Sequence, residues 1–219
     1  MSDHDHLLDP TPKPPPSPWN IANALTVLRI LLVPVYGWLL LAEGGDDARL
    51  RFWAAGVFLL ATLTDRVDGD IARRRGLITD FGKVADPIAD KALTGMAFVG
   101  LSLLGELPWW VTLLVLVREL GVTVLRFFVI RHGVMPAGRG GKLKTVLQSV
   151  TLTLFSLPLW VMPLSGLWVA AAWVTMVLAV AVTVVTGLDY LLKALHLRRT
   201  SERAAMKRER ARRARADRR

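Results

Sequence analysis

The chain has 219 residues, of which 53% are hydrophobic, and its mean hydropathy is +0.39. That is too apolar for an ordinary soluble domain of this length. The net charge is +10, but residues 193–219 alone hold twelve Lys and Arg against three Asp and Glu, so the rest is close to neutral. A basic stretch after a long apolar segment is more typical of a membrane's cytoplasmic edge than of nucleic-acid binding. Cysteine is absent, which excludes disulfides and thiolate metal sites.

The two ends of the chain differ in composition from the middle. Residues 1–18 are polar and rich in proline, and they lack the basic start and early apolar core of a cleavable signal peptide. We expect a disordered cytoplasmic N-terminus there, with His4-Asp5-His6 solvated rather than holding a metal. Residues 196–219 form a basic cytoplasmic tail, either helical on the inner leaflet or disordered.

Between these ends, residues 19–195 contain apolar runs near the roughly 20 residues that cross a bilayer as a helix. Four are separate runs, about 21–42, 50–72, 87–104 and 108–130, and a fifth stretch at 145–188 carries no formal charge. That stretch is long enough for two helices, with the break at Pro158, Pro163 and Gly166. The sequence therefore predicts an all-α integral membrane protein, a six-transmembrane-helix bundle.

The charges between the apolar runs predict the orientation. The segments at 43–47 and 105–108 are acidic or poor in Lys and Arg, whereas 73–75, 131–144 and the C-terminal tail are basic. The two kinds alternate, as six spans require, and the positive-inside rule then places both termini in the cytoplasm. The protein is expected in the cell (inner or plasma) membrane.

Six carboxylates fall between Asp65 and Asp90, beside apolar segments where a charged side chain is costly. Asp65 and Asp68 are three residues apart, and Asp86 and Asp90 are four apart, so each pair shares a helix face. Arg73-Arg74-Arg75-Gly76 is a good helix end, and Thr79 or Asp80 suits the cap of the next helix. Two antiparallel helices joined there would bring both pairs together on the cytoplasmic side.

Four carboxylates with few soft ligands nearby favour Mg²⁺, Mn²⁺ or Ca²⁺. Two such ions would roughly neutralise the cluster and form a clamp for phosphoryl transfer. Gly69 and Gly82 leave room beside the acidic faces, Ala72 keeps the same face open, and the Arg73 guanidinium matches phosphate oxygens.

Other interpretations of the cluster remain. Asp70 and Asp80, with the neighbouring arginines, are expected to form only surface ion pairs. The intramembrane carboxylates would also suit a proton or sodium relay in an ion-coupled carrier, although no repeat of broken helices supports that. An inactive scaffold is disfavoured, because all four aspartates are present.

The pattern Asp65-x2-Asp68-Gly69-x2-Ala72-Arg73-x8-Gly82-x3-Asp86-x3-Asp90 resembles the complete signature of the CDP-alcohol phosphotransferases, integral membrane enzymes of phospholipid synthesis. The resemblance implies a six-helix fold, usually homodimeric, with two divalent ions, Mg²⁺ or Mn²⁺. It implies a metal site made of Asp65, Asp68, Asp86 and Asp90, in which Asp90 is also the catalytic base. The residues expected at the CDP-lipid are Asn23, Thr26, Gly69, Ala72, Arg73, Thr79 and Gly82.

Residues 20–148 most resemble family members that use sn-glycerol 3-phosphate. That implies attack of its primary hydroxyl on the phosphorus next to diacylglycerol in CDP-diacylglycerol, giving phosphatidylglycerol phosphate and CMP. An inositol phosphate acceptor is the alternative, as in phosphatidylinositol phosphate synthesis. The cations proposed for the acceptor phosphate are Arg118, Arg126, Lys142 and Lys144.

Each of these polar residues also has a purely structural interpretation. For Glu119 the alternative is that it only neutralises Arg118, and for Lys142 and Lys144 that they only mark the cytoplasmic side. Asn23 and Thr26 would equally well bond a neighbouring helix. Arg29, about two turns inside the first apolar run, needs an anionic partner, either a substrate phosphate or a carboxylate.

Overall fold

The computed structural model describes residues 20–75, 79–130 and 139–216; the side chains at 22, 66–75, 80, 83, 125–130, 139–140 and 194–216 lie outside that description. These residues form α1 (Ile21–Leu41), α2 (Ala48–Arg75), α3 (Asp80–Leu103), α4 (Trp109–Ile130), α5 (Arg139–Ser156) and α6 (Ser165–Ala216). Two short 3-10 helices, η1 (Ala42–Gly45) and η2 (Leu159–Val161), lie in the connections. The described residues contain no strand, so the all-α prediction is confirmed.

Helix ends follow the local signals in the sequence. Asn20 caps α1 by accepting the Asn23 amide hydrogen at 3.0 Å, and Thr79 caps α3 by accepting that of Gly82 at 3.1 Å. Of the two residues predicted as the cap, Thr79 or Asp80, Thr79 is therefore the one that caps α3. The α5–α6 break falls at the predicted prolines. Helix α6 then continues past residue 195 to Ala216, so the backbone of most of the basic tail is helical; residues 1–18 lie outside the described residues.

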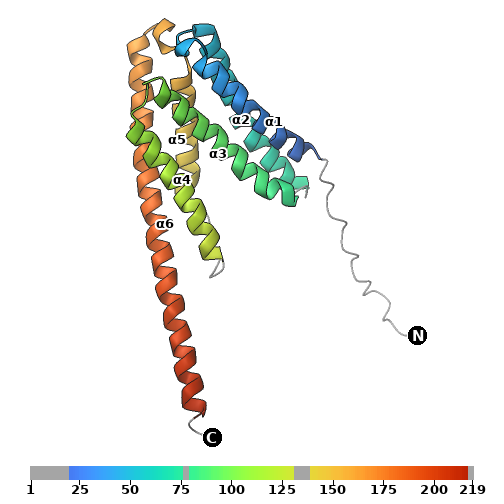
Figure 1. The fold of residues 1–219 in the computed structure, drawn as a ribbon, viewed down its shortest axis with the longest axis vertical. Helices are drawn as coiled ribbons and strands as arrows, with labels where there is room; N and C mark the ends of the chain where they lie inside the picture. Colours follow the sequence, from blue (N-terminus) through green and yellow to red (C-terminus); the bar gives the residue numbers. More distant parts are fainter. Residues whose placement is uncertain (1–19, 76–78, 131–138, 217–219) are drawn as a thin grey trace, which may run out of the picture.

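The helices run up and down, with the connections at 42–47, 104–108 and 157–164 at one end, the upper end in Figure 1. Helix α1 packs along both α2 and α3, while α2 and α3 make few direct contacts with each other. Helix α5 packs against α6 and α2, and α4 packs against α6. The last part of α6 extends beyond the other helices (Figure 1).

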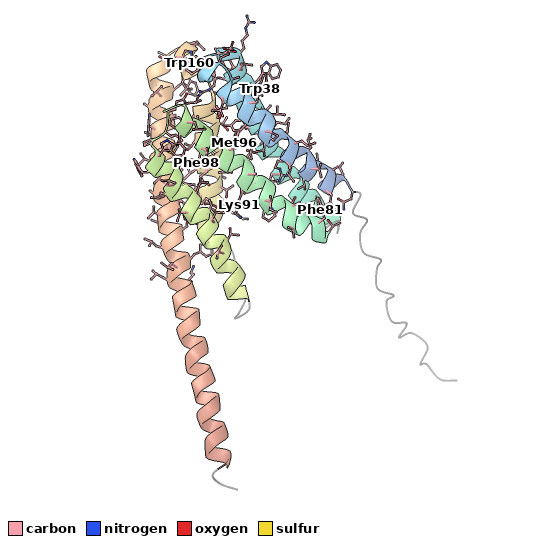
Figure 2. The ribbon with its side chains drawn as sticks, viewed as in Figure 1. Trp38, Phe81, Lys91, Met96, Phe98 and Trp160 are labelled. Atoms are coloured by element: carbon pink, nitrogen blue, oxygen red, sulfur yellow. The ribbon has the colours of Figure 1, made fainter. Side chains whose placement is uncertain are left out.

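Apolar side chains cover the outside of the bundle as well as its core. Tyr36, Phe58 and Phe98 are buried, yet Trp38 is 65% exposed and Phe81 49% exposed (Figure 2). Large exposed apolar faces on paired helices suit a lipid environment, where every backbone group is satisfied within the helix. Among the described residues, two segments, Asn23–Gly45 and Ser165–Lys193, are long and apolar enough to cross a membrane, so the six-span count stays a prediction.

A buried arginine ties together the end of the bundle that carries the three connections. Arg51 of α2 is 1% exposed and forms two hydrogen bonds to the Glu106 carboxylate, at 2.5 and 2.9 Å. It also donates to the carbonyls of Phe155 and Ser156, which lie in the last turn of α5, where carbonyls have no partner within the helix. The Trp160 ring lies 5.4 Å from its guanidinium carbon. Arg51 thus joins α2, the α3–α4 connection and α5.

Candidate active site

Helix α1 supplies polar partners to the carboxylates of both neighbouring helices. Arg29 donates to Asp65 of α2 at 2.5 Å, and Thr26 donates to Asp86 of α3 at 2.5 Å. Arg29 is 1% exposed, whereas the Asp65 side chain is 39% exposed. Arg29 was expected to need either a substrate phosphate or a carboxylate as its anionic partner, and a carboxylate is one of its partners. The acidic faces of α2 and α3 are therefore bridged by α1 rather than packed directly on each other.

One turn nearer the start of α1, Asn23 makes a second junction with α3. The Thr79 hydroxyl donates to the Asn23 side-chain oxygen at 2.9 Å, and both residues are buried. A Cβ added at Gly82 would lie 3.1 Å from that oxygen and 3.7 Å from an Asp86 oxygen. Gly82 thus allows α1 and the acidic face of α3 to approach closely. For Asn23 and Thr26, bonding to a neighbouring helix is what the structure shows.

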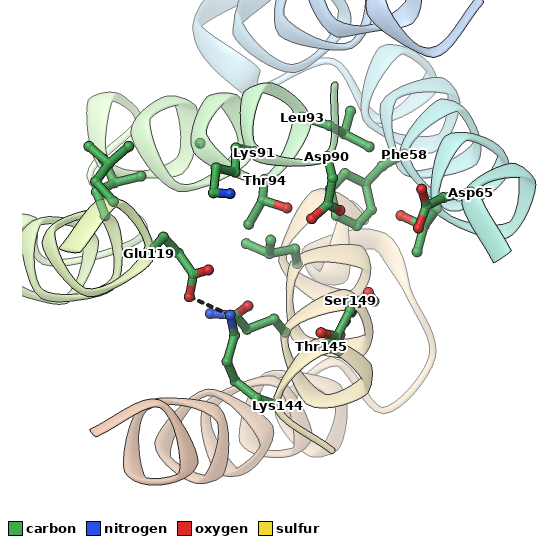
Figure 3. A pocket seen from close by; sticks show the side chains of 16 residues that line it. Phe58, Asp65, Asp90, Lys91, Leu93, Thr94, Glu119, Lys144, Thr145 and Ser149 are labelled. Carbon is green, nitrogen blue, oxygen red and sulfur yellow. Dashed lines mark hydrogen bonds and ion pairs between the residues drawn. The ribbon is translucent and has the colours of Figure 1, made fainter. Parts of the chain in front are cut away.

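A cavity of about 100 Å³ opens between α2, α3, α4 and α5. Figure 3 shows the Asp65 and Asp90 carboxylates on one side of it and the Glu119–Lys144 ion pair on the other. Three buried apolar side chains, those of Phe58, Leu93 and Leu152, also line it. Two predicted site carboxylates from different helices thus share one cavity with a predicted acceptor cation.

The chemistry of the donors suits hard cations. Asp65, Asp86 and Asp90 offer only oxygen atoms, and the chain has no cysteine. Among the described side chains no three acidic or histidine residues already gather as a cation cage. The side chain of Asp68, the fourth predicted ligand, lies outside the described residues. The donor set present therefore fits a divalent ion in kind.

The predicted acceptor cations lie in different places. Lys144 is buried, pairs with Glu119 and lines the cavity. Arg118 is directed to α6, where it donates to Thr186 at 2.7 Å, and it also pairs with Glu119 at 3.0 Å. Lys142 is exposed and does not line the cavity. The Arg126 side chain lies outside the described residues. Lys144 is thus the one described cation of this set at the cavity.

Three members of the predicted CDP-lipid set lie at the end of α2, where the structure describes the backbone and not the side-chain surroundings. They are Gly69, Ala72 and Arg73. Their positions are helical, as the motif spacing requires. Their contacts with a nucleotide remain predictions.

The cavity also contains residues that sequence reasoning missed or assigned differently. Glu119 was expected to neutralise Arg118, yet it bonds Lys144 as well. Gln148, Thr62 and Thr94 line the cavity without having been predicted. The available signal was helical spacing, since Gln148 follows Lys144 by four residues and shares its helix face.

Comparisons with known proteins show which family the chain belongs to. The family model described as CDP-alcohol phosphatidyltransferase matches residues 19–192. A "probable phosphatidylglycerophosphate synthase" of Mycobacterium tuberculosis is 53% identical over 176 residues, 80% of this chain and 82% of that protein. A CDP-diacylglycerol–glycerol-3-phosphate 3-phosphatidyltransferase of Bacillus subtilis is 36% identical over 84% of this chain and 99% of that protein. Together with the signature and the cavity, these matches show that the chain belongs to the CDP-alcohol phosphatidyltransferase family.

Proposed function

We propose that this protein transfers the phosphatidyl group of CDP-diacylglycerol to sn-glycerol 3-phosphate, giving phosphatidylglycerol phosphate and CMP. The observation that carries the proposal is the cavity in which Asp65 and Asp90 face Lys144. A base, a partial metal site and a phosphate-binding cation are the groups this reaction requires. The names of the relatives from M. tuberculosis and B. subtilis support this choice of substrates.

In the proposed reaction the Asp90 carboxylate accepts the proton of the acceptor's primary hydroxyl. That oxygen forms a bond to the phosphorus attached to diacylglycerol, the bond between this phosphorus and the bridging oxygen breaks, and CMP leaves. Asp65, Asp68, Asp86 and Asp90 would hold two divalent ions, Mg²⁺ or Mn²⁺, which when bound neutralise charge on the phosphoryl oxygens. Arg29 and Thr26 hold Asp65 and Asp86 in place from α1.

The acceptor phosphate is assigned to Lys144. Its ammonium group is buried and shares the cavity with Asp90, and Glu119 positions it by an ion pair. An acceptor bound by its phosphate at Lys144 would direct its free hydroxyl towards Asp90. Arg126 stays a further candidate for holding this phosphate. Arg118, which is directed to α6, and the exposed Lys142 would help attract the anion rather than hold it.

The proposed setting is a six-span protein in the cell membrane, with both termini and the cavity on the cytoplasmic side and a homodimeric assembly. The basic segments 73–75 and 139–144, together with the tail, support that orientation. CDP-diacylglycerol would then enter from the inner leaflet, and the water-soluble acceptor from the cytoplasm.

An acceptor panel tests the proposal. Purified protein in detergent would receive CDP-diacylglycerol and Mg²⁺, and then glycerol 3-phosphate, inositol 1-phosphate, inositol or serine in separate reactions, with CMP release and lipid product measured. We expect product with glycerol 3-phosphate alone. Product with inositol phosphate and none with glycerol phosphate would overturn the acceptor assignment, and CMP release with no acceptor would overturn the transfer itself.

A further inference from the structure

Gln148 is a buried residue of α5 with an unsatisfied donor. It is 5% exposed, and its side-chain nitrogen is fully buried and has no hydrogen-bond partner among the described residues. Leaving a buried donor unsatisfied lowers stability, so native proteins rarely do so without a reason. Ligand-binding sites are one such reason, because the ligand supplies the missing partner.

The position of Gln148 shows which part of a ligand it would meet. It lines the same cavity as Asp90 and Lys144. It follows Lys144 by four residues, which places it about 6 Å further along α5, on the same face. Leu152, one more turn along, is fully buried and apolar. Thr145 and Ser149 of α5 also line the cavity, but their hydroxyls donate to carbonyls of their own helix. Among the described polar side chains that α5 brings to the cavity near its apolar end, Gln148 is therefore the one with a donor left for a ligand.

The size of the cavity limits what can reach Gln148. Its volume of about 100 Å³ compares with the roughly 10–15 Å³ that one buried water requires on the same measure. Several water-sized groups fit, as in a small polyol, whereas an acyl chain does not. A small acceptor held at Lys144 and Asp90 has one further polar group between its two ends, namely its secondary hydroxyl.

We infer that Gln148 positions the acceptor alcohol by donating a hydrogen bond from its side-chain nitrogen to the secondary hydroxyl oxygen. The inference rests on the proposed function and adds a specificity-determining residue to it. Gln148 would select an acceptor with a hydroxyl next to the attacking one, and it would hold the primary hydroxyl towards Asp90. A site built to bond a hydroxyl discriminates against an analogue that lacks it.

The test compares two acceptors that differ in this hydroxyl alone. Full-length protein in detergent, with CDP-diacylglycerol and Mg²⁺, would be assayed with sn-glycerol 3-phosphate and with 3-hydroxypropyl phosphate. We expect wild-type kcat/KM to favour glycerol 3-phosphate by about tenfold or more. In Gln148→Leu and Gln148→Met that preference should fall to about twofold or less, because glycerol 3-phosphate loses rate while the analogue does not. The KM for CDP-diacylglycerol should not change.

Thr151→Val is the matched control. Thr151 lies on the same helix and is fully buried, and its hydroxyl has no partner in the described part of the chain, yet it does not line the cavity. Its variant should keep the wild-type preference. All three variants should unfold at the wild-type temperature or above it, since each removes an unsatisfied polar group. An unchanged preference in the Gln148 variants, or equal use of both acceptors by wild type, would overturn the inference; wild type that uses neither acceptor would refute the proposed function as well.

Discussion

Asp90 and Asp65 face the same cavity, but their surroundings differ. Asp65 is bonded to the buried Arg29, whereas no hydrogen bond or ion pair is found for Asp90 among the described residues. A carboxylate without a fixed partner is available to accept a proton. A carboxylate that neutralises a buried cation also supports the fold. Substitutions at the two positions should therefore have different consequences.

Asp90→Asn should remove the group proposed to accept the proton of the acceptor hydroxyl, while leaving the fold intact. Loss of a general base typically lowers the rate by 100-fold or more, so we expect about that fall in CMP release. The unfolding temperature in detergent should be unchanged, because the amide replaces the carboxylate with nearly the same shape. Asp189→Asn, at an exposed position of α6 paired with Lys193, is the control and should keep full activity. Wild-type activity in Asp90→Asn would refute the assignment of the base.

Asp65→Ala should lose both activity and stability. Removing the carboxylate takes one anionic partner away from the buried Arg29 guanidinium, at a cost of about 1–3 kcal/mol. Asp86→Asn should lose activity with little change in stability, because an amide oxygen can still accept the hydrogen bond that the Thr26 hydroxyl donates. Thermal unfolding of the purified variants distinguishes the two outcomes. Equal unfolding temperatures for Asp65→Ala and wild type would contradict the supporting role of Asp65.

The sequence indicated which carboxylates share a helix face, but not which side chains they contact. Helical spacing is a local property, and because α3 is helical from Asp80 to Leu103, Asp86 and Asp90 share a face as expected. The bonds from Arg29 to Asp65 and from Thr26 to Asp86 join positions 36 and 60 residues apart. Such contacts depend on how the helices pack, and one sequence carries no direct signal for that.

At the scale of helices, Arg51 should stabilise the bundle without taking part in the reaction. Asp65 lies fourteen residues further along α2, which places it about 21 Å away. Arg51→Ala would leave the Glu106 carboxylate and the two α5 carbonyls without their donor. We expect a loss of about 3 kcal/mol or more, seen as a lower unfolding temperature.

Arg51→Lys should recover only part of that stability, because an ammonium group cannot make the same paired bonds to Glu106. CMP release per folded molecule, measured well below the unfolding temperature, should stay near the wild-type value in both Arg51 variants. A selective loss of activity at unchanged stability would show that this end of the bundle communicates with the cavity.

Two glycines provide a matched test of the junction between α1 and α3. A Cβ at Gly82 would approach Asn23 within 3.1 Å, whereas a Cβ at Gly56 would meet nothing within 4 Å. Gly56→Ala should stabilise α2 by about 0.5–1 kcal/mol. Gly82→Ala should separate Asn23 from Thr79, displace the acidic face of α3 and lower activity. Unfolding temperature and CMP release for both variants check this, and a fully active Gly82→Ala would contradict it.

The helices themselves were largely predictable, and the reason is again local. Apolar runs, caps and prolines predicted the helices to within a few residues, with three exceptions. Charged segments extend α3 and α5 at their starts and α6 at its end, beyond the apolar runs. The packing of α1 between α2 and α3 was not predicted. Nor was the Arg51 junction, because it gathers residues from α2, the α3–α4 connection and the end of α5, which share no motif.

For the whole molecule, the distribution of basic segments predicts which end faces the cytoplasm. The chain contains no cysteine, so a single introduced thiol reports its own accessibility without background. Glu43→Cys would place a thiol in the 42–47 connection, and Lys142→Cys would place one near the start of α5; both positions are exposed.

In intact cells, a membrane-impermeant maleimide should label the Glu43→Cys thiol and leave the Lys142→Cys thiol unmodified until the membrane is permeabilised. The cysteine-free parent should remain unlabelled throughout. The opposite pattern would invert the topology and place the cavity on the side that a cytoplasmic acceptor cannot reach. Labelling of both thiols in intact cells would mean that these two ends of the helices do not lie on opposite sides of a membrane, which contradicts the six-span arrangement.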